Sequence, residues 1–231
     1  MSARSDREDY LSLVLHELRN PLVGIDAAAR VLTRELGPHP ASTRASAIAS
    51  EARHLLALLE SVADAEAAAA GRLRSHVRRV DLAALVRDTI AGMHIEGHPV
   101  TVAGVEAALM VQADSGRIRQ VLSNLLANAA QYSPAGTPID VSVNADPRRA
   151  TARVEVRDRG PGIAAPERRR LFRKFTRLTT ADGTRGSGLG LYICKAIVED
   201  HGGAITYSRA DVGSVFSFDL PLKKKRTAAK R

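Results

Sequence analysis

The sequence has 231 residues, of which 45% are hydrophobic, 26% are charged and 3% are aromatic. This length and composition fit one large globular domain or two smaller ones, with cores built from Leu, Val, Ile and Ala. The single cysteine, Cys194, excludes an intrachain disulfide and any metal site that needs several cysteines.

The net charge of +9 raises the question of an anionic partner, and it is concentrated in two places. The run at 223–231 (KKKRTAAKR) holds six bases and no acid, and we expect a solvated, disordered tail there. The cluster at 166–177 (PERRRLFRKFTR) is expected to face an anionic ligand. No run approaches the roughly 18 apolar residues of a membrane span, and the first ten residues lack the apolar stretch of a signal peptide, so we expect a cytoplasmic chain.

Apolar residues recur at alternating spacings of four and three from Leu11 to Leu36, which is the heptad pattern of a helix that packs along a seam. The turn sequence GPHP ends this helix, and a second seam runs from Ile48 to Val62. Two such helices joined by a short turn predict an antiparallel hairpin over residues 1–70. One hairpin leaves apolar surface exposed, so we expect two chains to form a homodimeric four-helix bundle.

His16 lies one step off this seam, with Glu17 beside it and Asn20 one turn further on. Pro21 cannot donate a hydrogen bond to the carbonyl of Glu17, and its ring presses on that carbonyl, so we expect the helix to bend or loosen here. The cost for an ordinary helix interior is on the order of 3 kcal/mol. Packing gives no reason for a strained turn beside an exposed titratable side chain, which indicates a functional site.

Residues 71–80 are expected to form a linker, and residues 81–222 alternate between helix-like and strand-like segments. Helices are predicted over 81–93, 115–133 and 191–201, the last ended by two glycines. We expect an α+β sandwich, with an antiparallel or mixed sheet covered by helices on one face. The expected strands are 98–104, 108–114, 138–145, 150–158, 204–210 and 213–222.

The long helix carries Asn124 and Asn128 four residues apart, so both lie on one face, and Tyr132 continues that face. Asparagine carbonyl oxygens are neutral, hard ligands that suit Mg²⁺. Taken alone, two such residues are more often part of a solvated stripe.

Two glycine-rich segments favour close approach of a ligand to the backbone. In DRGPGI, Asp158 ends a strand, and Gly160 and Gly162 follow it, although this pattern also fits a plain β-turn. In GTRGSGLGL (183–191), glycines precede a helix and leave several N–H groups available for phosphate. The second segment lacks the GK[ST] ending of a P-loop.

Five motifs occur in a fixed order along the chain: HELRNPL, NLLANAAQY, DRGPG, LFRKF and GSGLGL. On these motifs the chain resembles the two-component sensor histidine kinases over about residues 8–222. The resemblance implies a dimerization and histidine phosphotransfer domain at 1–70 and a Bergerat-type ATP-binding domain at 81–222. It also implies a receiver domain of a response regulator as the partner.

In the first motif the resemblance implies that Nε2 of His16 attacks the γ-phosphate of ATP. Glu17 would take or steer the other ring proton and make the imidazole more nucleophilic. Asn20 would orient water when the kinase dephosphorylates its partner. Pro21 would let the histidine-bearing turn meet two different active sites.

In the ATP-binding domain the resemblance implies that Asn128 is a Mg²⁺ ligand supported by Asn124. Asp158 would accept a hydrogen bond from the adenine amino group, and Arg177 would be a cation near the phosphates. The remaining ATP contacts would be Tyr132, Gly160, Gly162, Gly186, Ser187, Gly188, Leu189 and Gly190.

The sequence departs from the family pattern at two points. Gln131 stands where many members have lysine, so one phosphate contact is lost or passes to Arg177 or Arg185. Only 15 residues precede His16, so the chain is either an excised core or the partner of a separate sensor protein or domain.

Three other functions compete with the kinase. Hydrolytic ATPases of the gyrase, chaperone and mismatch-repair types place a glutamate where this chain has Asn124, which cannot act as a base. A histidine phosphotransfer scaffold without catalysis would not need intact ATP motifs. Nucleic-acid binding rests on charge alone and is not the expected activity.

Overall fold

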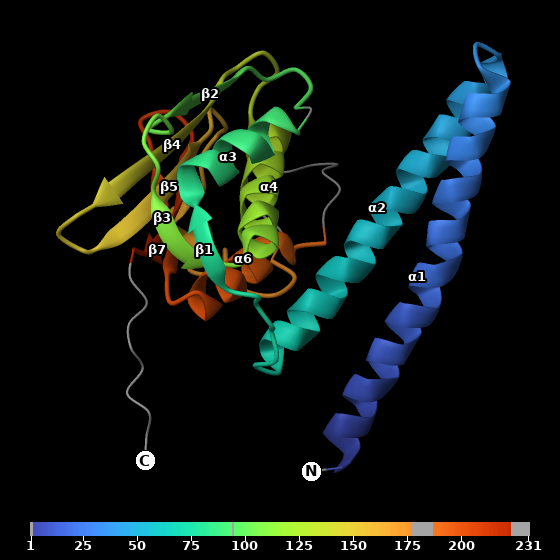
Figure 1. The fold of residues 1–231 in the computed structure, drawn as a ribbon, viewed down its shortest axis with the longest axis horizontal. Coiled ribbons are helices and arrows are strands. Elements are labelled where there is room, and N and C mark those ends of the chain that lie inside the picture. The colour runs from blue at the N-terminus through green and yellow to red at the C-terminus, as the bar shows by residue number, and fades with distance from the viewer. Residues whose placement is uncertain (1, 94, 177–186, 223–231) are drawn as a thin grey trace. The chain divides into compact units, whose positions relative to one another are not determined.

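The computed structural model describes residues 2–93, 95–176 and 187–222, with the side chains of residues 2–13 and 16 left out. The chain divides into two compact units, Met1–Gly71 and Arg72–Arg231, and each is described by itself. Figure 1 shows their elements. Within the described residues, no helix combines the length and the apolar character needed to cross a bilayer.

The first unit is a hairpin of two long helices, α1 (Ser2–Leu36) and α2 (Pro40–Ala69). The helix α1 continues through Pro21 as a single α-helix. At the turn, Nδ1 of His39 accepts a hydrogen bond from the backbone N–H of Ala41, and the proline at the start of α2 needs no such partner. The helical hairpin predicted from the two heptad seams is therefore confirmed.

Ion pairs connect the helices across the hairpin. Arg19 lies 3.6 Å from Glu60, and Arg53 lies 3.6 Å from Asp26. The hydrogen bond from Arg30 to Asp26, one turn along α1, lowers the pKa of that carboxyl below its usual value. On either side of these pairs small residues are buried in the hairpin, which lets the helices approach closely. The buried alanines are Ala29, Ala45, Ala49, Ala52 and Ala65.

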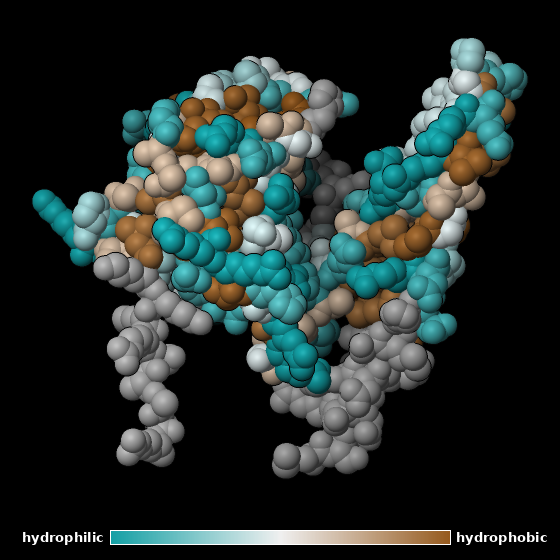
Figure 2. All heavy atoms as spheres, in the orientation of Figure 1, coloured by the Kyte–Doolittle hydropathy of each residue, from teal (hydrophilic) through white to brown (hydrophobic). Residues whose placement is uncertain are grey.

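The predicted seam of α1 is only partly buried within one hairpin. Ala29 is buried, whereas Leu18, Ile25 and Leu32 are 48%, 46% and 48% exposed and recur every seven residues. Exposed apolar side chains also lie on α2, at Ile48 and Leu55. Figure 2 shows apolar side chains at the surface along both helices. A single chain thus leaves several apolar positions of its heptad pattern exposed to water.

The second unit contains a five-stranded mixed sheet in the order β2-β4-β5-β7-β6, in which β2 and β4 are parallel and the other neighbours are antiparallel. The predicted α+β architecture is confirmed. The linker prediction was wrong at its end, because Arg78–Asp81 forms β1 and pairs with β3 (Met110–Ala113). The other elements are β2 (Val100–Ala103), β4 (Ile139–Asp146), β5 (Thr151–Arg157), β6 (Ala204–Arg209), β7 (Ser214–Pro221), α3 (Leu82–Ala91), α4 (Ser115–Tyr132), α5 (Ala165–Arg168) and α6 (Gly190–Asp200).

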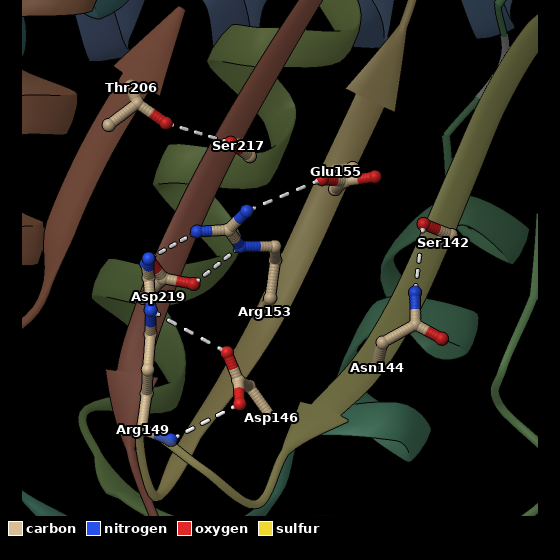
Figure 3. Close-up of polar contacts among 9 residues, drawn as sticks. All are labelled: Ser142, Asn144, Asp146, Arg149, Arg153, Glu155, Thr206, Ser217 and Asp219. Carbon is tan, nitrogen blue, oxygen red and sulfur yellow. Dashed lines mark hydrogen bonds and ion pairs between the residues drawn. The ribbon is translucent and has the colours of Figure 1, made fainter.

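The two faces of this sheet differ in polarity because side chains alternate along each strand. One face is apolar and is covered by α3, α4 and α6 (Figure 1). The other face is polar, and Figure 3 shows its contacts. There Arg153 donates to both oxygens of Asp219, at 2.7 and 2.9 Å, and this carboxylate raises the pKa of Arg153. The core therefore lies between the helices and one side of the sheet.

His201 joins the end of α6 to the start of α4. Its Nε2 accepts a hydrogen bond from the backbone N–H of Asp114 at 2.9 Å, and its Nδ1 lies 2.7 Å from the carbonyl of Ile197. Because a carbonyl only accepts, Nδ1 is the donor of the second bond. Asp114 in turn begins α4 by accepting from the N–H groups of Gly116 and Arg117. The buried imidazole thus fixes the two helices at one end.

We expect His201→Ala to lower the free energy of unfolding of the second unit by about 2 kcal/mol, because the N–H of Asp114 loses its acceptor. Native-state hydrogen exchange of the α4 amides measures this change. His54→Ala is the control, since His54 is exposed on α2 and should change stability by less than about 0.5 kcal/mol. Equal effects of the two substitutions would contradict the bridging role.

Candidate functional site

The helix α4 presents a buried apolar side and a half-buried polar side. Asn124 and Asn128 lie on the polar side, as the spacing predicted. An ideal Cβ built on Gly190 would lie 3.9 Å from Cγ and Nδ2 of Asn124. The first residue of α6 therefore lies against the first asparagine. The apolar side of α4 consists of Ile118, Val121, Leu122, Leu125, Leu126 and Ala129.

Cys194 fills the interface between α4 and α6. Its Sγ donates a hydrogen bond to the carbonyl of Val121 at 3.8 Å, and the residue is fully buried. Burial raises the pKa of this thiol to about 12, which outweighs a hydrogen bond with the side chain of Asn124. Asn124 is thus held between a buried thiol and the start of α6.

Asp158 is a buried carboxylate at the end of β5, with 4% of its surface exposed. Its Oδ1 accepts hydrogen bonds from the backbone N–H groups of Gly160 at 2.8 Å and Ser214 at 3.0 Å. Its own N–H donates to the carbonyl of Ser214. No described residue donates to Oδ2. One oxygen therefore orients the carboxylate, and the other can accept a hydrogen bond from a ligand.

The turn that follows Asp158 packs on the end of α4. A Cβ on Gly160 would lie 2.8 Å from the carbonyl oxygen of Tyr132, closer than side-chain carbons come to such atoms. The N–H of Arg159 also donates to Oγ of Ser133 at 3.2 Å. Glycine at position 160 is thus required for this close approach, and it brings the DRGPG segment to the asparagine helix.

Gly188 makes a second close approach. It has φ +68°, and a Cβ there would lie 2.9 Å from the backbone of Phe175 and of Thr176. Phe175 itself has φ +57°, which is rare for a bulky residue, and its surface is 68% exposed. The LFRKF and GSGLGL segments therefore meet at the start of α6. Gly162, with φ +71°, lies beside the backbone of Gly213.

The N-terminus of α6 differs from those of α3 and α4. Asp81 and Asp114 cap α3 and α4 with their carboxylates, but Leu189 makes no side-chain cap for α6. The first N–H groups of a helix lack partners within the helix and carry a positive partial charge. This end of α6 is consequently suited to an anion, next to the amide of Asn124.

Several predicted site residues can be placed only in part. Glu17 and Asn20 are exposed on α1, while the side chain of His16 lies outside the described residues. Arg177 and Gly186 also lie outside them. Among the remaining predicted contacts, Tyr132 and Ser187 are half-buried, whereas the side chain of Leu189 is buried, so it can offer only its backbone.

The sequence reasoning missed the residues that hold Asp158 and its turn. Gly213 passes so close to the carbonyl of Asp158 that a Cβ would lie 2.0 Å from it. Arg159 donates to Asp140 at 2.6 Å, and Thr101 donates to the same carboxylate at 2.7 Å. These bonds lower the pKa of Asp140, that of Thr101 contributing most. The sequence signal for this contact is Gly213, a glycine directly before a strand. This signal does not show that the contacting residue is Asp158.

Comparison with known families agrees with this arrangement. Residues 6–71 match the His Kinase A (phospho-acceptor) domain, and residues 113–224 match the histidine kinase-, DNA gyrase B- and HSP90-like ATPase family. The chain belongs to the two-component histidine kinase family. Both domain matches fall in the order that the sequence motifs predicted.

Curated relatives support the same family. This histidine kinase core is 30% identical over 227 residues to the sensor-like histidine kinase SenX3 of Mycolicibacterium smegmatis, covering 93% of this chain and 57% of that protein. It is 33% identical over 224 residues to the adaptive-response sensory kinase SasA of a Synechococcus species, covering 94% and 57%. The chain spans from a quarter to about three fifths of such relatives.

Solved structures resemble this histidine kinase core in fold as well. Full-length ShkA in complex with AMPPNP aligns with a TM-score of 0.74 and 29% identity, over 92% of this chain and 45% of that one. The mycobacterial sensor histidine kinase MprB aligns with a TM-score of 0.55 and 30% identity, over 62% of this chain and 97% of that one. The second unit of the chain therefore has the fold of the histidine kinase-type ATPase family that it matches over residues 113–224.

We expect Gly188→Ala to weaken ATP binding at least about tenfold, because the added methyl group would displace the backbone at the start of α6. Isothermal titration calorimetry measures the affinity. Gly136→Ala is the matched control, since Gly136 has φ +81° but nothing within 4 Å of its ideal Cβ. It carries the same backbone penalty without the collision, and its ATP affinity should match the parent. Equal loss in both variants would contradict the steric argument.

Proposed function

We propose that this chain is an ATP-dependent protein histidine kinase, which phosphorylates itself on His16 and passes the phosphoryl group to an aspartate of a response regulator receiver domain. The observation that carries the proposal is the meeting of Asn124 with Gly190 at the uncapped start of α6. This contact places the side-chain amide of Asn124 next to a helix start suited to phosphate. The match of residues 6–71 to the phospho-acceptor domain family, which includes His16, supports the assignment of the phosphorylated residue.

The adenine end of ATP would lie at Asp158, whose Oδ2 is available to accept from the adenine amino group. Gly160 and Gly162 would let the base approach the backbone, and Tyr132 would line the same end of α4. The discrimination against guanine follows from chemistry, because guanine presents a carbonyl oxygen at the place of that amino group. Two acceptors would then face each other.

The phosphates would lie at the first turn of α6, held by the N–H groups of Gly188 and Gly190 and by Ser187. Arg177 and Gly186 are proposed further contacts. Asn128, one turn after Asn124 on the same side of α4, offers a hard oxygen that fits Mg²⁺, with Asn124 supporting it. When bound, Mg²⁺ neutralises charge on the phosphates. The residues present therefore suit a magnesium nucleotide.

At the phosphoacceptor, Nε2 of His16 would form a bond to the γ-phosphorus while the bond from phosphorus to the β–γ bridging oxygen breaks and leaves ADP. The proton on Nδ1 would be taken or steered by Glu17. Asn20 has no basic group, but its amide can orient water for hydrolysis of the partner's phospho-aspartate. The missing N–H of Pro21 loosens the carbonyl of Glu17 next to this chemistry.

With labelled ATP and Mg²⁺, the parent should take up label that is lost in acid and stable in base, as phosphohistidine is. His16→Ala should fold, bind ATP and take no label. Asp158→Asn serves as the nucleotide control, because the asparagine oxygen can keep both backbone hydrogen bonds while its NH₂ replaces the free acceptor. This variant should label normally only at higher ATP concentration. Label that persists in His16→Ala would overturn the assignment.

The same assay, with a receiver domain added, distinguishes the role of Glu17 from that of Asn20. Glu17→Ala should slow autophosphorylation, whereas Asn20→Ala should spare it and slow dephosphorylation of the receiver. Groups of this kind contribute roughly 10²–10⁴-fold, so the difference is measurable. Dephosphorylation at the parental rate in Asn20→Ala would remove that residue from the proposal.

We propose a homodimer through the hairpin, because Leu18, Ile25 and Leu32 form an exposed apolar strip on α1. The strip repeats every seven residues, which suits a four-helix bundle. A second copy would cover it together with Ile48 and Leu55 of α2.

Light scattering at micromolar concentration should give the mass of a dimer. Ile25→Glu should yield monomers, since it places a charge within the strip. Val23→Glu is the control: Val23 is also exposed, at 51%, but it lies on the opposite side of α1. A monomeric parent, or equal dissociation of both variants, would contradict the proposal.

A further inference from the structure

The segment that enters the second unit from α2 is held at two consecutive residues. Oγ of Ser75 donates to Oδ2 of Asp200 at 2.6 Å, and the backbone N–H of His76 donates to Oδ2 of Asp114 at 2.7 Å. Asp200 is the last residue of α6, and Asp114 is the cap of α4. The linker is thus attached to the ends of the two helices that carry the nucleotide site.

Asp114 divides its two oxygens between two tasks. Oδ1 accepts from the N–H groups of Gly116 and Arg117, at 2.9 and 3.1 Å, and begins α4. Oδ2 accepts from the linker. Burial raises the pKa of this carboxyl, but the N–H donors of His76, Arg117 and Gly116 outweigh burial and hold the pKa below its usual value. The carboxyl group is therefore an ionised acceptor at neutral pH, and the backbone N–H of the same residue donates to Nε2 of His201 at the end of α6.

The linker, residues 70–77, begins at a position along the hairpin that is close to that of His16. The pairs Arg19–Glu60 and Asp26–Arg53 fix an antiparallel register that places the backbone of His16 near Ala63. The end of α2, at Ala69, lies six residues further, or about 9 Å along the helix. Any change in the length of chain between α2 and the second unit therefore acts near His16.

The two hydrogen bonds set that length. They leave five residues, 70–74, between the end of α2 and Ser75. Without them the next fixed element is β1 at Arg78, and the connection has eight residues, 70–77. The maximum span rises from about 17 to about 27 Å. The effective concentration of one domain near the other falls roughly as the −3/2 power of length, or about twofold.

We propose that Asp114 is a clamp for the interdomain linker, with Oδ1 capping α4 and Oδ2 holding the linker, and that release of the linker slows phosphoryl transfer to His16 without weakening ATP binding. The inference rests on the proposed kinase activity for its rate consequence. Asp114 is a positioning residue in this scheme, since it acts through the chain that it holds. Ser75 is the second attachment of the same clamp.

Asp114→Asn tests the clamp in the full chain. Asparagine caps helices as well as aspartate does, so its oxygen can keep the bonds to α4. Its NH₂ then replaces Oδ2 and faces the N–H of His76, donor against donor. Asp81→Asn is the matched control, because Asp81 caps α3 and accepts from Ala83, Ala84 and Leu109 through Oδ1 alone.

Three measurements are compared in the two variants: hydrogen exchange of the amides of residues 72–78, ATP affinity by calorimetry, and the first-order rate of autophosphorylation at saturating ATP. In Asp114→Asn only the exposed bond from Ser75 to Asp200 still holds the linker. We expect the His76 amide to exchange about tenfold faster, unchanged ATP affinity, and a rate lower by at most about twofold. Asp81→Asn should match the parent in all three. Ser75→Ala should change exchange and rate in the same direction as Asp114→Asn.

Unchanged exchange in Asp114→Asn would overturn the clamp. Faster exchange with an unchanged or higher rate would overturn its kinetic consequence, and weaker ATP binding would reduce Asp114 to a helix cap. A parent that takes no label at all would instead overturn the proposed kinase, while the exchange comparison would still decide whether Asp114 holds the linker.

Discussion

The burial of one side of α4 between the sheet and α6 is the constraint on which the second unit depends. Val121, Leu122, Leu125 and Leu126 are at most 1% exposed, and their burial fixes the rotation of the helix about its axis. Once that rotation is fixed, Asn124 and Asn128 must lie on the other side, where α6 begins. The arrangement of the polar groups is thus a consequence of apolar packing, and it needs no separate stabilisation.

Glycines then determine how closely the remaining segments approach. Gly160 meets the carbonyl at the end of α4, Gly188 meets the backbone of Phe175 and Thr176, and Gly213 meets Asp158. At each point any larger side chain would separate two segments that are distant in sequence. Loops that are distant in sequence can therefore meet at the end of α4 and at the start of α6, while the sheet remains regular.

The periodic parts of this fold could be predicted from the sequence, and the long-range contacts could not. Heptad spacing predicted the hairpin, and the order of the motifs predicted the ATP-binding domain. Both predictions rest on patterns of residues that are near one another in the sequence. The heptad pattern does not tell which half of the seam faces the second helix, so the exposure of Ile25 appears only in three dimensions. The bond between Asp158 and Ser214 joins residues 56 positions apart, and the β1 strand depends on its partner β3, so neither leaves a local signal.

The burial of Cys194 has a consequence for redox chemistry. Thiols react with oxidants and alkylating agents as thiolates, and a thiol with a pKa of about 12, enclosed between two helices, supplies almost none at neutral pH. Since it is the only cysteine in the sequence, the folded chain offers no reactive sulfhydryl group. An oxidant could react with this sulfur only after α4 and α6 separate. Covalent modification of Cys194 would therefore indicate that the nucleotide site had already come apart.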